Sequence, residues 1–168
     1  NLTVWASVPS VILVMSRFGQ LKDGALPTVR ISFFAGEVLS KHSAKLWLNA
    51  APHTVLDNHY GPTEVTVTCT AFRCLRSEVD FLPEIVPIGN PYSNMFVEIL
   101  GPDGQFVSGT EVGEIALAGR QVGAGYINNK EMTAEKFVEI DHPTLGSKIW
   151  YLTGDFGYKD CQGIVHYV

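Results

Sequence analysis

The sequence predicts an α/β fold in which a helix-covered, mostly parallel sheet is followed by a small, β-barrel-like part. Three observations support this prediction. Short β-branched and apolar runs alternate with helix-length segments up to about residue 56, which is typical of parallel strands joined by helices. From residue 65 onward the sequence pattern predicts mostly strands, in which apolar and polar residues alternate, and few helices. Hydrophobic residues make up 46% of the 168 residues, which is enough to bury a core.

The first part of the chain predicts three strands and two helices. Pro9 ends the first apolar run, and a helix begins there because proline and serine favour the first turn. Ser40 is expected to cap the second helix, since its hydroxyl can accept from an N–H of the first turn. The expected elements are strands over residues 2–8, 29–34 and 54–56 and helices over residues 10–18 and 41–49.

The second part predicts mostly strands. Residues 65–72 alternate as a strand does, and residues 95–100 and 113–117 are expected to pair as a hairpin around the turn residues Pro102, Asp103 and Gly104. A charged helix is expected near residues 130–138 with a solvated face, and two strands follow at 148–152 and 164–167. We place the boundary between the α/β part and the β-rich part between residues 88 and 89.

Composition excludes several classes of protein. Twelve basic and 17 acidic residues give a net charge of -5 without any basic block, so neither nucleic acid nor an anionic membrane is an expected partner. The cysteines are odd in number and lack paired spacing, which favours neither a zinc site nor a disulfide framework. No apolar run reaches the roughly 20 residues that span a bilayer. We therefore expect a soluble cytoplasmic protein.

The most informative segment is residues 58–64, with the sequence N-H-Y-G-P-T-E. Tyr60 offers an aromatic face for stacking a base, and the glycine and proline that follow it favour a tight turn. The hydroxyl of Thr63 can hydrogen-bond a phosphate oxygen, and the carboxylate of Glu64 is a hard oxygen ligand suited to magnesium. These properties indicate a nucleotide site, although an ordinary capped loop has the same composition.

Further segments follow in a recognisable order. Residues 113–119 (G-E-I-A-L-A-G) lead to residues 123–127 (G-A-G-Y-I), and residues 151–155 (Y-L-T-G-D) lie near the end. Together with residues 58–64 they resemble the adenylation domains of the acyl-adenylate-forming superfamily. Residues 131–137 (E-M-T-A-E-K-F) resemble a helix of its nonribosomal peptide synthetase and D-alanine ligase branch.

The resemblance implies ATP-dependent adenylation of an amino acid or small carboxylic acid, followed by transfer to the phosphopantetheine thiol of a carrier protein. It implies that residues 1–88 are part of the nucleotide- and substrate-binding subdomain, and that residues 89–168 end at the hinge to a C-terminal subdomain. The chain would then be an incomplete central piece of a larger adenylation domain. The upstream phosphate loop and a downstream lysine would lie outside it, so we expect the chain alone to be inactive.

The resemblance also implies roles for individual residues. Thr63 and Glu64 would contact the α-phosphate and Mg²⁺, and they are the expected catalytic pair, with Glu64 as the metal ligand. The ATP or AMP would be held by Asn58 at the adenine amine, Tyr60 against the ring, Gly36 along the adenine pocket, Asp155 at the ribose, and Tyr167 nearby. From the residues alone, Asp155 could instead form a turn and Tyr167 could be a half-buried strand tyrosine.

A substrate pocket is implied in the same way. Phe33 and His59 are bulky for this pocket and would favour a small or unusual amino acid, although His59 could simply fill volume. Its neighbour Asp57 is expected to cap or to face solvent. Two alternatives remain open, namely a fragment of an acyl-CoA ligase and a nucleotide-binding module without catalysis. The implied pocket residues are Ala6, Phe33, Ala35, His59, Val67 and Thr68.

Overall fold

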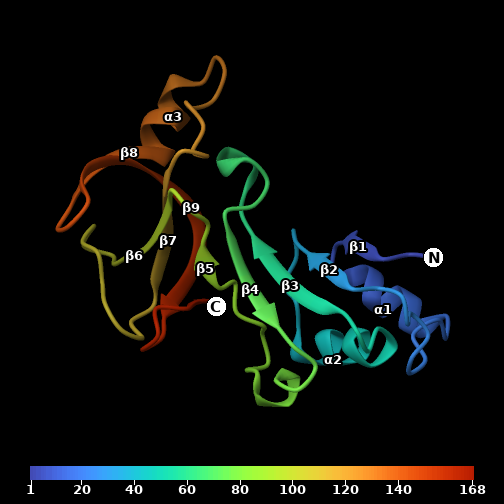
Figure 1. The fold of residues 1–168 in the computed structure, drawn as a ribbon. Helices are drawn as coiled ribbons and strands as arrows, with labels where there is room; N and C mark the ends of the chain where they lie inside the picture. Colours follow the sequence, from blue (N-terminus) through green and yellow to red (C-terminus); the bar gives the residue numbers. More distant parts are fainter. The chain divides into compact units, whose positions relative to one another are not determined.

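The computed structural model describes residues 1–168, which separate into two compact units. The first unit comprises Asn1–Tyr60 and Ala71–Gly89, and the second comprises Gly61–Thr70 and Asn90–Val168. Each unit contains its own β-sheet (Figure 1). The predicted α/β class is confirmed. No helix of the chain has both the length and the apolar character needed to cross a bilayer.

The first unit is built on a sheet in which β1, β2, β3 and β4 lie side by side in that order. β1 and β2 are parallel, as are β2 and β3, so the predicted strand–helix rhythm is confirmed. The elements of this unit are β1 (Val4–Ser7), α1 (Ser10–Arg17), β2 (Ile31–Phe34), α2 (Lys41–Ala50), β3 (Val55–Tyr60), β4 (Thr70–Cys74) and the 3₁₀ turn η2 (Val79–Phe81).

Both helices of the first unit pack on one face of this sheet. Ile12 of α1 and Trp47 of α2 are fully buried in one cluster with Phe34 of β2 and Leu56 of β3. The indole N–H of Trp47 donates to the hydroxyl of Ser32 at 2.8 Å, so this core contains a satisfied polar pair. Because side chains alternate along a strand, the residues next to Phe34 and Leu56 face the opposite side of the sheet.

The cap at the start of α2 is the one that the sequence predicts. The hydroxyl of Ser40 accepts from the backbone N–H of Ser43 at 3.1 Å, which satisfies one of the orphan donors of the first turn. The start of α1 is different, since Pro9 provides no side-chain cap there. The first backbone N–H of α1, that of Ser10, donates instead to the side chain of Glu37.

The second unit contains an antiparallel sheet in the order β10, β9, β7, β6. β8 pairs with the first residues of β9, from Gly146 to Tyr151. The predicted hairpin of β6 and β7 is confirmed. Trp150 is fully buried and packs against Phe106 at 4.9 Å between ring centroids. The elements are the 3₁₀ turn η1 (Thr63–Val65), β5 (Asn90–Pro91), β6 (Met95–Leu100), β7 (Gly113–Gly119), α3 (Lys130–Lys136), β8 (Phe137–His142), β9 (Gly146–Lys159) and β10 (Val165–Tyr167).

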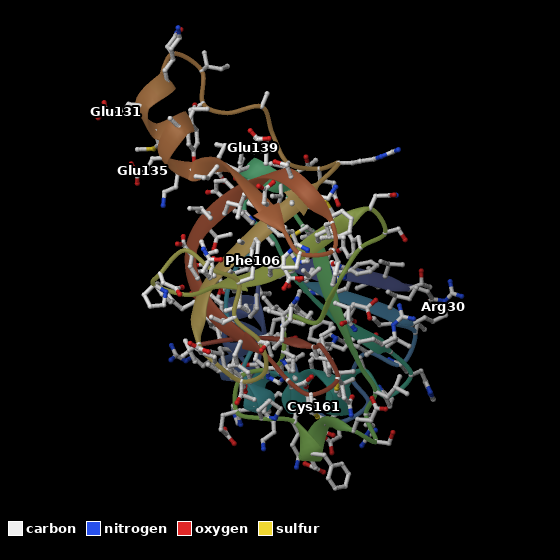
Figure 2. All side chains as sticks on the ribbon, turned by 90° about the vertical axis from the view of Figure 1, so that its left-hand side faces the viewer. Arg30, Phe106, Glu131, Glu135, Glu139 and Cys161 are labelled. Atoms are coloured by element: carbon white, nitrogen blue, oxygen red, sulfur yellow. The ribbon has the colours of Figure 1, made fainter.

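The helix α3 carries the solvated face that the sequence predicts. None of its residues is buried, and Glu131 and Glu135 project away from the ribbon of the unit (Figure 2). The side chain of Asn129 caps the helix by accepting from the backbone N–H of Met132 at 3.0 Å. The helix is therefore held at its beginning rather than by an apolar stripe.

The predicted strand over residues 65–72 is wrong in its first half. Thr63–Val65 form a 3₁₀ turn, Thr66 and Val67 have φ angles of 63° and 73°, and the strand begins only at Thr70. Alternating β-branched residues favour a strand, but contacts described below hold this segment in left-handed backbone. β8 was not predicted, because its residues were assigned partly to the preceding helix.

Candidate functional site

The residues predicted to form the site divide between the two units. The first unit contains Ala6, Phe33, Ala35, Gly36, Asn58, His59 and Tyr60, and the second contains Thr63, Glu64, Val67, Thr68, Asp155 and Tyr167. Each unit brings part of its own set together.

Asn58 leaves one buried acceptor without a partner. Its side chain lies on β3, is 3% exposed, and donates through Nδ2 to the carbonyls of Pro87 at 2.9 Å and Val86 at 3.3 Å. Both amide protons are thereby used, and Oδ1 has no hydrogen-bond partner. An unsatisfied buried oxygen is costly, so this atom fits a ligand that brings an N–H donor. The exocyclic amine of adenine is such a donor.

Three of the predicted pocket residues share the sheet face that the helices do not cover. The Cα of Phe33 is in register with Ala6 of β1 on one side and with Asp57 of β3 on the other. The rings of Phe33 and His59 meet edge to face at 5.4 Å between centroids. Burial lowers the pKa of His59 below its usual 6.5, so the imidazole is neutral at pH 7. Ala35 follows β2 directly and is partly exposed.

Asp57 does not cap a helix or face solvent as predicted. It is 5% exposed, and Arg73 of β4 donates to both of its carboxylate oxygens, through Nε at 2.8 Å and through Nη2 at 2.9 Å. Such a bidentate pair fixes two planar groups in one geometry. Asp57 therefore links β3 to β4 directly next to Asn58 in the strand.

Gly36 is exposed and has a φ of 86°, a conformation that favours glycine. The residue after it, Glu37, accepts from the backbone N–H of Ser10 at 2.8 Å and from the Ser10 hydroxyl at 3.0 Å. Glu37 thus satisfies the beginning of α1 and ties the 35–37 segment to it. No local pattern predicts this contact, because the two residues are 27 positions apart. Tyr60 ends β3 and is partly exposed.

In the second unit, Glu64 is held through both its side chain and its backbone. Its Oε1 accepts from the hydroxyl of Tyr126 at 2.6 Å, and its carbonyl accepts from the backbone N–H of Gly123 at 2.7 Å. The hydrogen bond from Tyr126 lowers the pKa of Glu64 below its usual 4.5, so the carboxylate is charged at pH 7. Thr63, one residue earlier, is exposed. Sequence reasoning missed Tyr126, which lies 62 positions away.

Gln121 clamps the strained segment that follows Glu64. Its side-chain Nε2 donates to the carbonyl of Thr68 at 3.0 Å, and its own carbonyl accepts from the hydroxyl of Thr66 at 3.1 Å. A positive φ at a β-branched residue costs about 1–3 kcal/mol, so such contacts are needed to hold it. Val67 is 73% exposed, and the hydroxyl of Thr68 accepts from Tyr92 at 3.1 Å. The pocket roles of Val67 and Thr68 remain predictions.

Asp155 and Tyr167 lie together in the second unit, and their ligand-binding roles remain predictions. The hydroxyl of Tyr167 on β10 donates to Oδ1 of Asp155 on β9 at 3.4 Å. Asp155 lies within β9 and does not form a turn. Glu114 and Ala116 of β7 pair with Phe156 and Leu152 of β9, so residues 153–155 of β9 form a bulge opposite Ile115. Bulges re-aim side chains and recur beside active sites.

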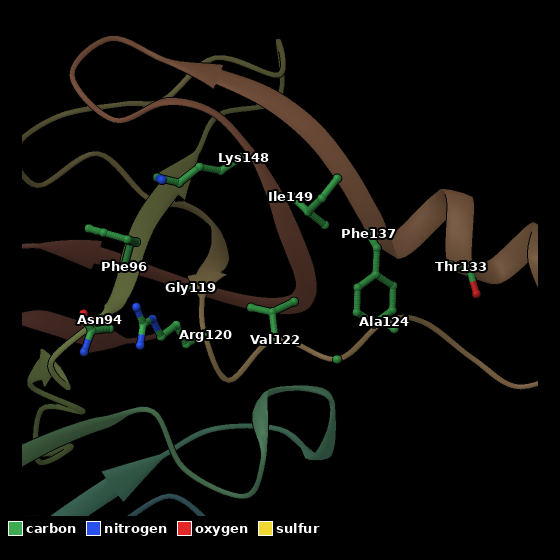
Figure 3. Close-up of a pocket in the computed structure, with 11 residues that line it drawn as sticks. Asn94, Phe96, Gly119, Arg120, Val122, Ala124, Thr133, Phe137, Lys148 and Ile149 are labelled. Carbon is green, nitrogen blue, oxygen red and sulfur yellow. The ribbon is translucent and has the colours of Figure 1, made fainter.

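A separate cavity of about 720 Å³ lies in the second unit, and none of the predicted site residues lines it (Figure 3). Arg120 and Lys148 contribute positive charge, and Lys148 lies 5.3 Å above the ring of Phe96. The remaining lining residues are Asn94, Gly119, Val122, Gly123, Ala124, Thr133, Phe137 and Ile149.

Comparison with known proteins identifies the family. Residues 1–127 match the family model described as AMP-binding enzyme, which is most of the chain. The chain belongs to the AMP-binding enzyme family. The predicted resemblance to adenylating enzymes is thereby confirmed.

Individual relatives of this AMP-binding chain agree with its family. The D-alanine–D-alanyl carrier protein ligase of Bacillus cytotoxicus is 33% identical over 99% of this chain and 32% of that protein. The Vibrio cholerae adenylation domain AlmE, solved with glycyl-adenosine-5'-phosphate, has a TM-score of 0.88 at 30% identity over 99% of this chain and 31% of that chain. PA1221, a nonribosomal peptide synthetase protein with adenylation and PCP domains, has a TM-score of 0.86 at 26% identity over 98% and 32%. The chain therefore spans about a third of the length of these relatives.

Proposed function

We propose that this chain is the central part of an enzyme that uses ATP to convert an amino acid carboxylate into an aminoacyl-AMP, for transfer to a carrier-protein thiol. Family membership and the named relatives support the proposal. The observation that carries it is the buried Oδ1 of Asn58, an acceptor without a partner where the adenine amine is expected. A core packed for stability alone would satisfy that atom.

Each proposed nucleotide role is assigned to an individual residue. Asn58 accepts from the adenine amine and Tyr60 stacks on the ring, while the backbone at Gly36 lies along the adenine. Asp155 accepts from the ribose hydroxyls, and Tyr167 supports it through the hydrogen bond between the two side chains.

Glu64 is proposed as the magnesium ligand, with Thr63 at the α-phosphate. The donor set fits, because Glu64 is a charged, partly exposed carboxylate, and the hydroxyl of Tyr126 donates to its Oε1. When bound, magnesium supplies charge neutralisation at the phosphates during in-line displacement. The chain's own contribution is to hold the carboxylate and the hydroxyl in place, since this reaction depends mainly on positioning and electrostatics.

The carboxylic substrate is proposed to bind beside Ala6, Phe33 and His59, on the sheet face that the helices do not cover. The edge-to-face pair of Phe33 and His59 takes up space there and favours a small side chain. Contacts with the substrate are also proposed for Ala35, Val67 and Thr68. A CoA thiol as the acceptor in place of a carrier protein is the second possibility that the family allows.

The proposal is tested by ATP–pyrophosphate exchange in the full-length protein across a panel of amino acids and other carboxylic acids. We expect exchange with a small amino acid, and loss of exchange in Asp155→Ala. Exchange with other carboxylic acids alone would favour a CoA ligase. No exchange with any acid, together with retained ATP binding, would overturn the catalytic assignment in favour of a binding module.

The role of Asn58 has a sharper test. Purine riboside triphosphate lacks the exocyclic amine, so the wild-type protein should bind it about 10-fold or more weakly than ATP. Asn58→Ala should bind both nucleotides equally weakly. Equal affinity of the wild-type protein for the two nucleotides would contradict the proposed contact. The isolated 168-residue chain is expected to show no exchange at all.

A further inference from the structure

Three segments far apart in the sequence converge on the side chain of Glu64. The hydroxyl of Tyr126 donates to Oε1 of Glu64 at 2.6 Å, and the hydroxyl of Tyr151 lies 3.5 Å from that of Tyr126. Glu64 belongs to the 58–64 segment, Tyr126 to the glycine-rich 123–127 segment and Tyr151 to the 151–155 segment. The proposed nucleotide roles use Glu64 and leave both tyrosines without a function.

Contacts of its backbone and of its ring hold Tyr126 in place. Its backbone N–H donates to the hydroxyl of Thr133 in α3 at 2.9 Å, and that hydroxyl donates in turn to the carbonyl of Asn129 at 2.8 Å. Its ring meets Phe137 edge to face at 5.6 Å between centroids, and Phe137 meets Tyr151 at 5.1 Å. The phenol oxygen of Tyr126 therefore has little freedom to move away from Glu64.

Gly125 explains why Thr133 can come this close. Its φ is 123°, and a Cβ on it would lie 2.4 Å from Cγ2 and 2.9 Å from Oγ1 of Thr133. A glycine is therefore required where the backbone of residues 125 and 126 docks on α3. The backbone of Glu64 is held from the same loop, through the N–H of Gly123 at 2.7 Å.

We propose that Tyr126 is a positioning residue for magnesium binding, which holds Oε1 of Glu64 so that Oε2 is presented to the metal. This inference rests on the proposed role of Glu64 as the metal ligand. The hydrogen bond from Tyr126 to Oε1 restricts the rotation of the carboxylate, which favours coordination of the metal through Oε2. Partners of this kind, when removed, typically cost about 10–100-fold in metal affinity or activity.

The test measures metal binding without turnover. Magnesium is titrated by calorimetry into the full-length protein saturated with α,β-methylene-ATP, with no carboxylic substrate present. Tyr126→Phe keeps the ring that packs against Phe137 and removes only the hydroxyl. Tyr158→Phe is the matched control, because Tyr158 lies on β9 with its ring stacked on His166 and makes no contact with Glu64. Glu64→Gln removes the charge of the proposed ligand, and the Glu64→Gln/Tyr126→Phe double variant measures coupling.

We expect Tyr126→Phe to raise the half-saturating magnesium concentration by about 10-fold or more, and Tyr158→Phe to leave it unchanged. In the Glu64→Gln background, the loss of the Tyr126 hydroxyl should have no further effect, because its only route to the metal is through that carboxylate. An unchanged magnesium requirement in Tyr126→Phe, when Glu64→Gln raises it, would overturn the positioning role and leave the metal assignment standing. An unchanged requirement in Glu64→Gln would overturn both.

Discussion

Gly89 allows the backbone of two segments of the first unit to touch, and its substitution should damage both the fold and the proposed nucleotide contact of Asn58. A Cβ at this position would lie 2.0 Å from the carbonyl oxygen of Ala71 and 2.5 Å from the nitrogen of Phe72. These are backbone atoms of β4, so no side-chain rotation relieves the overlap. The residue also has a φ of 84°, which disfavours any side chain.

The cost of Gly89→Ala follows from these two terms. The positive φ costs about 1–2 kcal/mol, the overlap costs about 1–3 kcal/mol, and the lower entropy of the unfolded chain returns about 0.4–1 kcal/mol. The free energy of unfolding should therefore fall by about 1–5 kcal/mol. Residues 86 and 87, which accept from Asn58, lie just before Gly89, so ATP affinity should fall as well.

The measurement is urea unfolding of the full-length protein, with hydrogen exchange of the β3 and β4 amides to locate the loss. Gly104→Ala is the matched control, because its φ is 77° but nothing lies within 4 Å of the added methyl. It carries the backbone cost without the overlap. Equal destabilisation by the two substitutions would refute the argument that close backbone approach is what requires Gly89.

Two other predictions concern charged groups. Arg73→Ala should lower the free energy of unfolding by about 1–3 kcal/mol, because Asp57 is buried and receives both of its hydrogen bonds from Arg73. Arg73 is itself exposed, which keeps the cost below that of breaking a fully buried pair. Arg73→Lys should recover only part of this loss in chemical denaturation, and full recovery would contradict the bidentate argument. Burial raises the pKa of Asp160, but hydrogen bonds from His166 and from two backbone N–H groups outweigh it and lower the pKa below 3.8. The charged Asp160 therefore stabilises the folded state above its unfolded pKa, and this contribution is lost as the pH falls through its folded pKa. The difference in free energy of unfolding between the wild type and Asp160→Asn should shrink below about pH 4. An unchanged difference down to pH 2.5 would contradict this prediction.

Local signals account for the parts of the fold that the sequence predicted. Ser40 caps α2 through a hydroxyl three residues from its partner, and Pro9 ends β1 by its own backbone restriction. The order of the motifs was enough to place the chain in its family. It also named Asp155 and Tyr167, which are 12 positions apart and lie together in the structure.

The parts that were missed depend on contacts between distant residues. The pair of Asp57 and Arg73 and the clamp of Gln121 on residues 66–68 leave no periodic trace in the sequence. The tripeptide at residues 153–155 has the composition of a turn, but it lies inside a 14-residue strand. It stays there because Glu114 of β7 accepts from the backbone N–H of Gly154 at 2.7 Å, a contact across 40 positions.

The ionisable groups of the candidate site indicate what kind of chemistry it can perform. Hydrogen bonding lowers the pKa of Glu64, and burial lowers the pKa of His59, so the first remains charged and the second neutral at pH 7. The bond to Glu64 raises the pKa of Tyr126, and burial raises that of Tyr167, so both phenols keep their protons. Every one of these shifts moves away from neutrality, whereas a general acid or base works best with a pKa near the working pH. This pattern fits acyl-adenylate formation, in which carboxylate oxygen attacks phosphorus and pyrophosphate leaves with little proton transfer. Under the proposed function, each of these residues would act by positioning rather than by proton transfer, and the hydroxyl of Tyr126 would matter for the reaction only through Glu64.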